Sequence, residues 1–356
     1  MNARRRGADE MGIFGLGLCT PLGLTARTTQ VEMAAGTVRF FETDVVDTAG
    51  EPVRASLLPL MKPELTRTER MTLLAVTAFQ EVMKDMTSLG IQRLPLLLAL
   101  PEPGSGSPFE LRALLRVLTD AAGPVRLETS EEVAFSEGRA GFFHALAEAS
   151  LLLRSRQEPW VLVGGVDSLC DRDSLTHHAR TYRSLGPNTR DGILPGEGAG
   201  FFLLASPVPR GQRAGAAQGC IVACSLSREP NAFLQRRPNL AEGLTETFRQ
   251  LRQHPAAGTR RVDHLMSCQT GETFWTQEFS CAYLRNAQLM PEPLTMSVVA
   301  ESLGDVGAAA GAIQLGSALY RLKKLEQAHG TTARVLIYGC ADAGQTGACI
   351  IEGENE

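Results

Sequence analysis

The chain has 356 residues, of which 44% are hydrophobic and 21% charged, and its net charge is −4 at pH 7. This length and composition suit a globular protein with one large two-lobed domain or two ordinary domains. The balanced charge argues against nucleic-acid binding and against a polybasic membrane anchor, and no apolar run approaches the ~20 residues of a membrane-spanning helix.

The eight cysteines are scattered through apolar or small-residue surroundings, with no CxxC pair. This usage is typical of reduced thiols in a cytosolic protein. Three arginines at 4–6 precede an apolar stretch, as in an export signal, but Asp9 and Glu10 interrupt the basic start. Leu18 also stands where a small residue would precede a lipidated Cys19. We therefore expect a cytoplasmic protein.

The first half of the chain alternates predicted strands and helices. Buried strands are predicted at 12–18, 94–100 and 160–163, and helices at 65–86, 110–118 and 133–153. Ser136 is the predicted N-cap of the last helix. The apolar face of the 65–86 helix is predicted to comprise Leu73, Leu74, Ala75, Ala78 and Val82. Buried strands separated by helices indicate parallel crossovers in a covered sheet.

The second half repeats this scheme, with strands predicted at 219–225, 264–267, 335–338 and 347–352 and helices at 240–253 and 306–327. The ends of the halves can be superposed, with 163–167 and 196–202 matching 337–342 and 344–350. We therefore predict two duplicated α/β halves, at 11–206 and 219–353, joined by a Pro/Gly/Ala-rich connection. Residues 1–10 are polar and are predicted to be disordered.

Four ordered segments resemble the β-ketoacyl synthases of the thiolase superfamily. They are GLGLCTPLG at 15–23, LRS at 153–155 leading into GGV at 164–166, RDGILPGEGAG at 190–200, and GDVGAAAG at 304–311. The resemblance implies an α/β thiolase-like fold, in which two duplicated βαβαβαββ halves form a layered α/β/α/β/α architecture. Gly15-x-Gly17 lacks the third glycine of a dinucleotide motif, and GEGAG lacks the Lys-Ser/Thr of a phosphate loop. We expect no cofactor and no metal.

The resemblance also implies a catalytic Cys-His-His set, and each of these positions holds another residue. Counting back from Gly164-Gly165 without gaps, the cysteine position falls on Arg139, while the two histidine positions fall on Cys268 and Asp305. The lysine that precedes the second histidine in the family is replaced by Ala300. A guanidinium is protonated at any useful pH and cannot attack a thioester. We therefore expect that the chain does not condense acyl groups.

The replaced residues are expected to share one pocket, in which Arg139 and Asp305 face each other and Glu301 joins them. A buried arginine must be paired, so this set would close the site as an ion-pair plug. The predicted pocket residues are Arg139, His144, Cys268, Thr270, Glu301, Asp305 and Gly344.

Two other interpretations of the same residues stay open. Arg139 at a helix N-terminus would suit a phosphopantetheine phosphate or a carboxylate, and Cys268 with Asp305 and His144 would suit a relocated nucleophile. A core role is the alternative for His144, which lies on an apolar helix. His264, four positions before Cys268, is interpreted as a strand-start or surface histidine.

Three functions follow from the resemblance. The first is an inactive partner of the chain-length-factor type, which pairs with an active ketosynthase. The second is an adaptor or scaffold outside acyl metabolism, and the third is a divergent acyltransferase that uses Cys268. The expected partners are a second copy or an active ketosynthase, with an acyl carrier protein as a further candidate and neither nucleic acid nor membrane. The segment 174–188 is shorter and more polar than the family's Phe-Asp gate, which leaves few residues to line an acyl tunnel.

Overall fold

The computed structural model describes residues 10–129, 134–155, 158–187, 189–206, 217–235 and 237–353. The predicted disordered start at 1–9 and most of the predicted connection, at 207–216, lie outside these residues. Glu10, which was grouped with that start, is buried. Within the described ranges, no helix combines the length and apolar character needed to cross a bilayer. No group of three or more His, Cys, Asp or Glu side chains in those ranges is placed to hold a metal ion.

Each half of the chain contributes five strands to the main path of the sheet, in the same spatial order, and β6 (Ala134–Phe135) of the first half also pairs with β4. The first half runs β5-β4-β7-β8-β1, with bounds Arg126–Glu128, Arg93–Ala99, Val161–Ser168, Glu197–Ala205 and Met11–Cys19. The second half runs β11-β10-β12-β13-β9, with bounds Met296–Val298, His264–Ser267, Arg334–Cys340, Gln345–Glu352 and Cys220–Arg228. The first three strands of each series are parallel, and the last two join antiparallel. The halves therefore repeat one topology, as predicted, and they meet where β1 pairs with β9.

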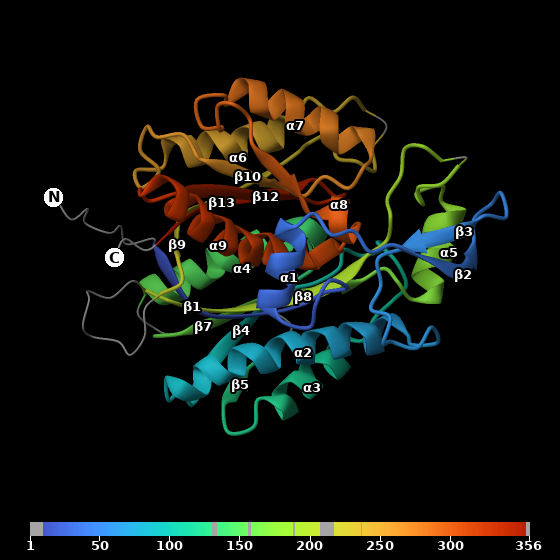
Figure 1. Cartoon of the computed structure of the whole chain (residues 1–356), viewed down its shortest axis with the longest axis horizontal. Helices are drawn as coiled ribbons and strands as arrows, with labels where there is room; N and C mark the ends of the chain where they lie inside the picture. The colour runs from blue at the N-terminus through green and yellow to red at the C-terminus, as the bar shows by residue number, and fades with distance from the viewer. Residues whose placement is uncertain are drawn as a thin grey trace.

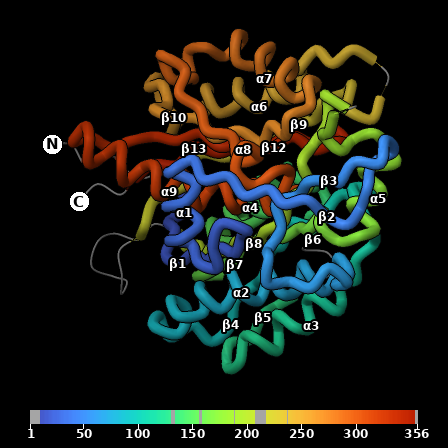
Figure 2. Tube along the Cα trace, turned by 45° about the vertical axis from the view of Figure 1, so that its right-hand side comes forward, coloured from blue at the N-terminus to red at the C-terminus, as the bar shows by residue number. Residues whose placement is uncertain are grey.

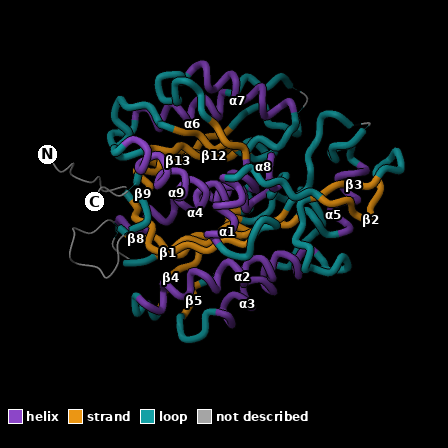
Figure 3. The backbone as a smooth tube through the Cα atoms, in the orientation of Figure 1, coloured by secondary structure: helices purple, strands orange, loops and turns teal. Residues whose placement is uncertain are grey.

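Helices form three layers around these sheets (Figure 1). The central layer holds α4 (Gly138–Arg154) and α9 (Ala310–His329), which contact strands of both halves. The outer layers are α2 (Arg67–Ser88) with α3 (Leu111–Ala121), and α6 (Glu242–Gln253) with α7 (Thr273–Arg285). Figure 3 shows the resulting alternation of helix and strand layers, which is the predicted α/β/α/β/α architecture. The N-termini of both central helices lie where the carboxyl ends of strands meet.

Smaller elements surround this frame (Figure 2). They are α1 (Ala26–Ala34), the hairpin β2–β3 (Phe41–Val46 and Pro52–Ala55), β6 (Ala134–Phe135), α5 (Arg172–Arg180), α8 (Val299–Leu303) and a 3-10 turn at Gly307–Ala309. Sequence reasoning did not predict α1, the hairpin, α5, α7 or α8. Apart from α7, each of these elements is too short for a periodic pattern to identify it. All eight cysteines are free, as expected, although Cys224 and Cys281 are only half-buried.

Three local predictions were wrong. Leu73 is 47% exposed because it lies just outside the buried stripe of α2. The N-cap position of α4 belongs to Glu137 rather than Ser136, because Gly138 enters the helix with φ +50°. The helix predicted from 306 begins at Ala310, since Gly304 and Gly307 adopt positive φ and turn the chain first.

Candidate functional site: a buried charge cluster

Arg139 lies in the first turn of α4 and is 5% exposed. Its Nη1 donates to Asp305 Oδ2 at 2.9 Å, its Nη2 to Asp342 Oδ1 at 2.5 Å, and its Nε to the Cys340 carbonyl at 3.0 Å. The guanidinium also sits 4.6 Å from the centre of the Trp275 ring. Burial acts to lower the pKa of Arg139, but Asp305 and Asp342 raise it well above its usual value. Arg139 is therefore a fixed cation at this site.

Asp342 connects Arg139 to a second arginine. Its Oδ2 accepts from Arg183 Nη1 at 2.6 Å. Arg183 also donates two hydrogen bonds to Glu272, from Nε at 3.0 Å and from Nη2 at 2.9 Å. Glu272 in turn accepts from Trp275 Nε1 at 3.0 Å and from Thr270 Oγ1 at 3.3 Å. Burial acts to raise the pKa of Asp342, but Arg139 and Arg183 together hold it below its ordinary value.

Two further contacts fix the backbone around these carboxylates. Glu102 accepts the backbone N–H groups of Asp342 and Ala343, each at 2.9 Å, and Asp305 Oδ1 accepts the Gly307 N–H at 2.9 Å. Burial, aided by the charge of Asp342, raises the pKa of Glu102. We call this set the charge cluster and define it as Glu102, Arg139, Arg183, Glu272, Asp305 and Asp342.

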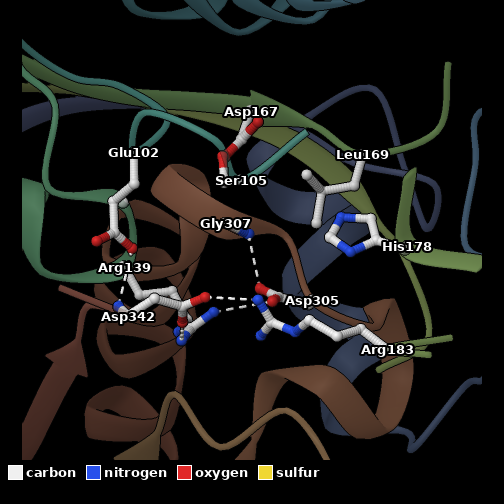
Figure 4. Close-up of a pocket in the computed structure, with 11 residues that line it drawn as sticks. Glu102, Ser105, Arg139, Asp167, Leu169, His178, Arg183, Asp305, Gly307 and Asp342 are labelled. Carbon is white, nitrogen blue, oxygen red and sulfur yellow. Dashed lines mark hydrogen bonds and ion pairs between the residues drawn. The ribbon is translucent and has the colours of Figure 1, made fainter. Parts of the chain in front are cut away.

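The charge cluster leaves little open volume (Figure 4). A cavity of about 20 Å³ remains beside Arg139, Asp305 and Arg183. A cavity of ~10–15 Å³ is the minimum for one water molecule, so the space suits about one water and cannot hold an acyl chain. In chemical terms, the cluster offers paired ions and no free nucleophile.

The structure brings some of the predicted pocket residues together and separates others. Arg139, Asp305 and Thr270 lie in or against the charge cluster. Cys268 is buried beside Cys340 and close to Arg139, but it does not line the cavity. Ala300 is half-buried on α8.

Glu301, His144 and Gly344 lie elsewhere. Glu301 is exposed, and it lines a different cavity from the one that Asp305 lines. His144 is half-buried more than one turn along α4, and its Nε2 has no hydrogen-bond partner among the described residues, so it is not a satisfied core histidine. Gly344 forms the turn between β12 and β13 with φ +98°, and its carbonyl accepts from Glu229 N at 2.7 Å. His264 begins β10, as expected, but it is buried rather than on the surface, with Nε2 2.9 Å from Ser297 Oγ.

Sequence reasoning missed Glu102, Arg183, Glu272 and Asp342 as members of the cluster. Arg183 comes from the polar segment 174–188, which the sequence predicts to contribute little to a tunnel lining. Asp342 lies in the turn between β12 and β13, and an acidic residue just after a predicted buried strand was the available signal, because a buried arginine needs a partner. The other two carboxylates carry no local signal, because only the fold brings them to Arg139.

Glu197 gives the GEGAG segment a structural role. Its carboxylate accepts two hydrogen bonds from Arg70 at 2.8 Å, one from the Leu58 N–H and one from Ser168 Oγ. Glu197 and Arg70 are both almost fully buried. The segment therefore ties α2 to the ends of β7 and β8.

His178 of α5 faces the same cavity and predicts a pH dependence. The side chain is buried, and neither ring nitrogen has a hydrogen-bond partner among the described residues. Burial, with the nearby charge of Arg183, lowers the pKa of His178 from 6.5 to about 4. The pKa of His178 is lower in the folded state than in the unfolded state. The neutral ring therefore makes its full contribution to the free energy of unfolding above pH ~6.5. This contribution falls as the pH drops from ~6.5 to ~4, by about 3 kcal/mol.

The variant His178→Leu should lack this part of the acid destabilisation, which urea unfolding between pH 7 and pH 4 would measure. His329→Asn, at an exposed position on the last turn of α9, is the matched control and should keep the wild-type slope. An unchanged slope in His178→Leu would contradict the assignment.

Comparisons with known proteins show the fold. No family model matches the sequence, and no curated protein is similar to it in sequence. Among solved structures, the ketosynthase from module 6 of the bacillaene synthase of Bacillus subtilis 168 matches with a TM-score of 0.78 at 13% identity, over 98% of this chain and 72% of that one. The ishigamide ketosynthase/chain length factor matches at 0.73 and 19% identity, over 98% and 99% of the two chains.

A third match is the AntDE:AntF complex, a type II polyketide synthase acyl-carrier protein bound to its ketosynthase. It has a TM-score of 0.74 at 12% identity, over 97% of this chain and 99% of that one. At such identities these matches establish the thiolase-like ketosynthase fold, as predicted. Activity has to be argued from the site itself.

Proposed function

We propose that this chain is a non-condensing subunit with the ketosynthase fold, which pairs with an active ketosynthase in an acyl-assembly complex in the manner of a chain-length factor. The observation that carries the proposal is Arg139, which occupies the position predicted for the nucleophile and is bound by Asp305 and Asp342. A permanently protonated, doubly paired guanidinium supplies no electron pair for attack on a thioester.

The shape of the site supports the same proposal. The ~20 Å³ beside Arg139 leaves no room for an acyl group. Arg183, from the segment that takes the place of the family's gate, fills the adjoining space and pairs with Asp342 and Glu272. An acyl chain would have to displace several buried ion pairs, at a cost of several kcal/mol.

The alternative acyltransferase with Cys268 as nucleophile finds little support. An activated thiol needs a neighbouring base or cation and access to its substrate. Arg139 supplies a cation close to Cys268, but Cys268 is 5% exposed and does not line the cavity, so a thioester has no access to its thiol. The thiol lies beside that of Cys340, and His144 does not line the cavity either. Arg139 as a free anion site is also disfavoured, because Asp305 and Asp342 already occupy its Nη groups.

Partnership is supported by the completeness of the fold. Both halves and all three helix layers are present, and the chain aligns with nearly the whole length of the ishigamide ketosynthase/chain length factor. In the first half, β5 and β6 both pair with β4 at the edge of the sheet. A subunit that had lost only its catalytic residues would retain the fold and the sheet edge through which it could pair with a ketosynthase.

A direct test is intact-mass analysis after incubation with an acyl-pantetheine thioester. The expected result is no added acyl mass on the wild type, while an active ketosynthase treated in parallel gains one acyl group. Added mass that disappears in Cys268→Ala would establish the acyltransferase alternative.

Partnership is tested separately by co-expression with an active ketosynthase from the same organism, followed by native mass spectrometry. A one-to-one heterodimer is expected. A stable homodimer, with no detectable complex with the ketosynthase, would instead favour the adaptor or scaffold alternative.

A further inference from the structure

A second cavity, much larger than the first, lies on another face of the C-terminal half. Its volume is about 220 Å³, and its walls come from α1, the strands β10 and β11, and the helices α8 and α9. These helices lie side by side (Figure 2), and α9 contacts both α1 and α8. None of its lining residues belongs to the charge cluster.

Three methionines from three different elements line this cavity, together with the smaller apolar residues Ala34, Val38 and Val298. The methionines are Met33 of α1, Met266 of β10 and Met296 of β11. Met266 is buried, while the other two are half-buried. Methionine side chains are flexible and polarisable, so they adapt to apolar groups of varied shape.

Two opposite charges also border the cavity, Glu301 of α8 and Arg321 of α9. Neither side chain has a hydrogen bond or an ion pair with any described residue. By contrast, the buried arginines Arg67, Arg70, Arg139 and Arg334 are each in an ion pair. Two unpaired opposite charges on the walls of one cavity favour a ligand that carries both signs, since a lone anion would face Glu301 and a lone cation would face Arg321.

Polar side chains and the cavity's size define the ligand further. Ser297 and Ser302 lie on the wall, and Gln30 is fixed there by a 2.7 Å hydrogen bond from Nε2 to the Gly316 carbonyl. A cavity of ~150 Å³ in another protein holds benzene, so by proportion this one accommodates roughly nine non-hydrogen atoms. That is the size of leucine, norleucine or methionine.

We propose that this cavity binds a small zwitterion with an apolar chain, of the class of the apolar α-amino acids. The carboxylate pairs with Arg321, the ammonium group with Glu301, and the chain packs on Met33, Met266 and Met296. This site is independent of the charge cluster, and the proposal does not rest on the proposed function.

The test is titration calorimetry, with ligand-observed NMR for weak binding, using a matched six-carbon series on the full chain. Norleucine is expected to bind, and hexanoate and hexylamine, which each lack one charge, at least tenfold more weakly. Arg321→Met and Glu301→Gln should each weaken norleucine binding at least tenfold. Lys323→Met, on the same helix but outside the cavity, should leave it unchanged.

Several outcomes would overturn the proposal. No norleucine binding at millimolar concentration would do so, as would hexanoate or hexylamine binding as tightly as norleucine. Unchanged norleucine affinity in both charge variants would also reject the site. Because Glu301 is exposed, Glu301→Gln should fold even if Arg321→Met does not, so the assignment stays testable.

Discussion

Replacing Arg139 with methionine should destabilise the protein by about 3–5 kcal/mol, because it leaves the buried carboxylates of Asp305 and Asp342 without their shared cation. Both ion pairs are almost fully excluded from solvent. Methionine retains most of the apolar part of the arginine side chain. The loss of stability would therefore measure the effect of removing the charge rather than the effect of lost packing. Urea unfolding at pH 7 measures it.

The matched control is Arg249→Met. Arg249 forms a bidentate contact with Glu246 on exposed turns of α6, and exposed pairs contribute only ~0–1 kcal/mol. Adding Asp305→Asn to Arg139→Met should recover part of the stability, because it removes one of the uncompensated charges. A loss below about 1 kcal/mol in Arg139→Met would show that the cluster does not depend on this cation.

The charge cluster also shows how far sequence reasoning reached. The aligned spacing placed Arg139 opposite Asp305, and these residues are 2.9 Å apart although 166 positions separate them in the chain. The prediction succeeded because the pattern of strands and helices determines the two-lobed fold. The fold in turn determines which loop lies opposite the N-terminus of each central helix.

The same reasoning failed to predict contacts that depend on the direction of a side chain or on a distant element of the fold. Glu301 lies only four residues before Asp305, yet the chain turns at Gly304, with φ +67°, and the two side chains line different cavities. Glu102 reaches the cluster through the backbone of Asp342 and Ala343, a relation that no local pattern encodes. Periodicity reports which face of an element is buried, but it does not report which distant element covers that face.

A deeper consequence of the duplication is found at two equivalent glycines. In β12, a Cβ added to Gly339 would lie 2.0 Å from the carbonyl oxygen of Arg139, at the start of α4. In β7, a Cβ added to Gly165 would lie 2.7 Å from the carbonyl oxygen of Ala308, just before α9. Each half thus uses a glycine in its third parallel strand to bring the start of a central helix against the sheet.

Gly339→Ala is therefore expected to cost about 3 kcal/mol or more, because the obstacle is backbone, which cannot rotate away as a side chain can. The same substitution would push Arg139 away from the Cys340 carbonyl that holds its Nε. Chemical denaturation measures the loss, and Gly165→Ala provides a replicate in the other half with the same sign.

Gly330→Ala supplies the control for Gly339→Ala. Gly330 caps α9 with φ +66° and open space around it, so alanine there should cost only the ~1–2 kcal/mol of a left-handed conformation. A loss at Gly339 no larger than at Gly330 would contradict the close approach of β12 and α4. A loss at Gly339 with none at Gly165 would mean that the two halves share topology but hold their central helices by different contacts.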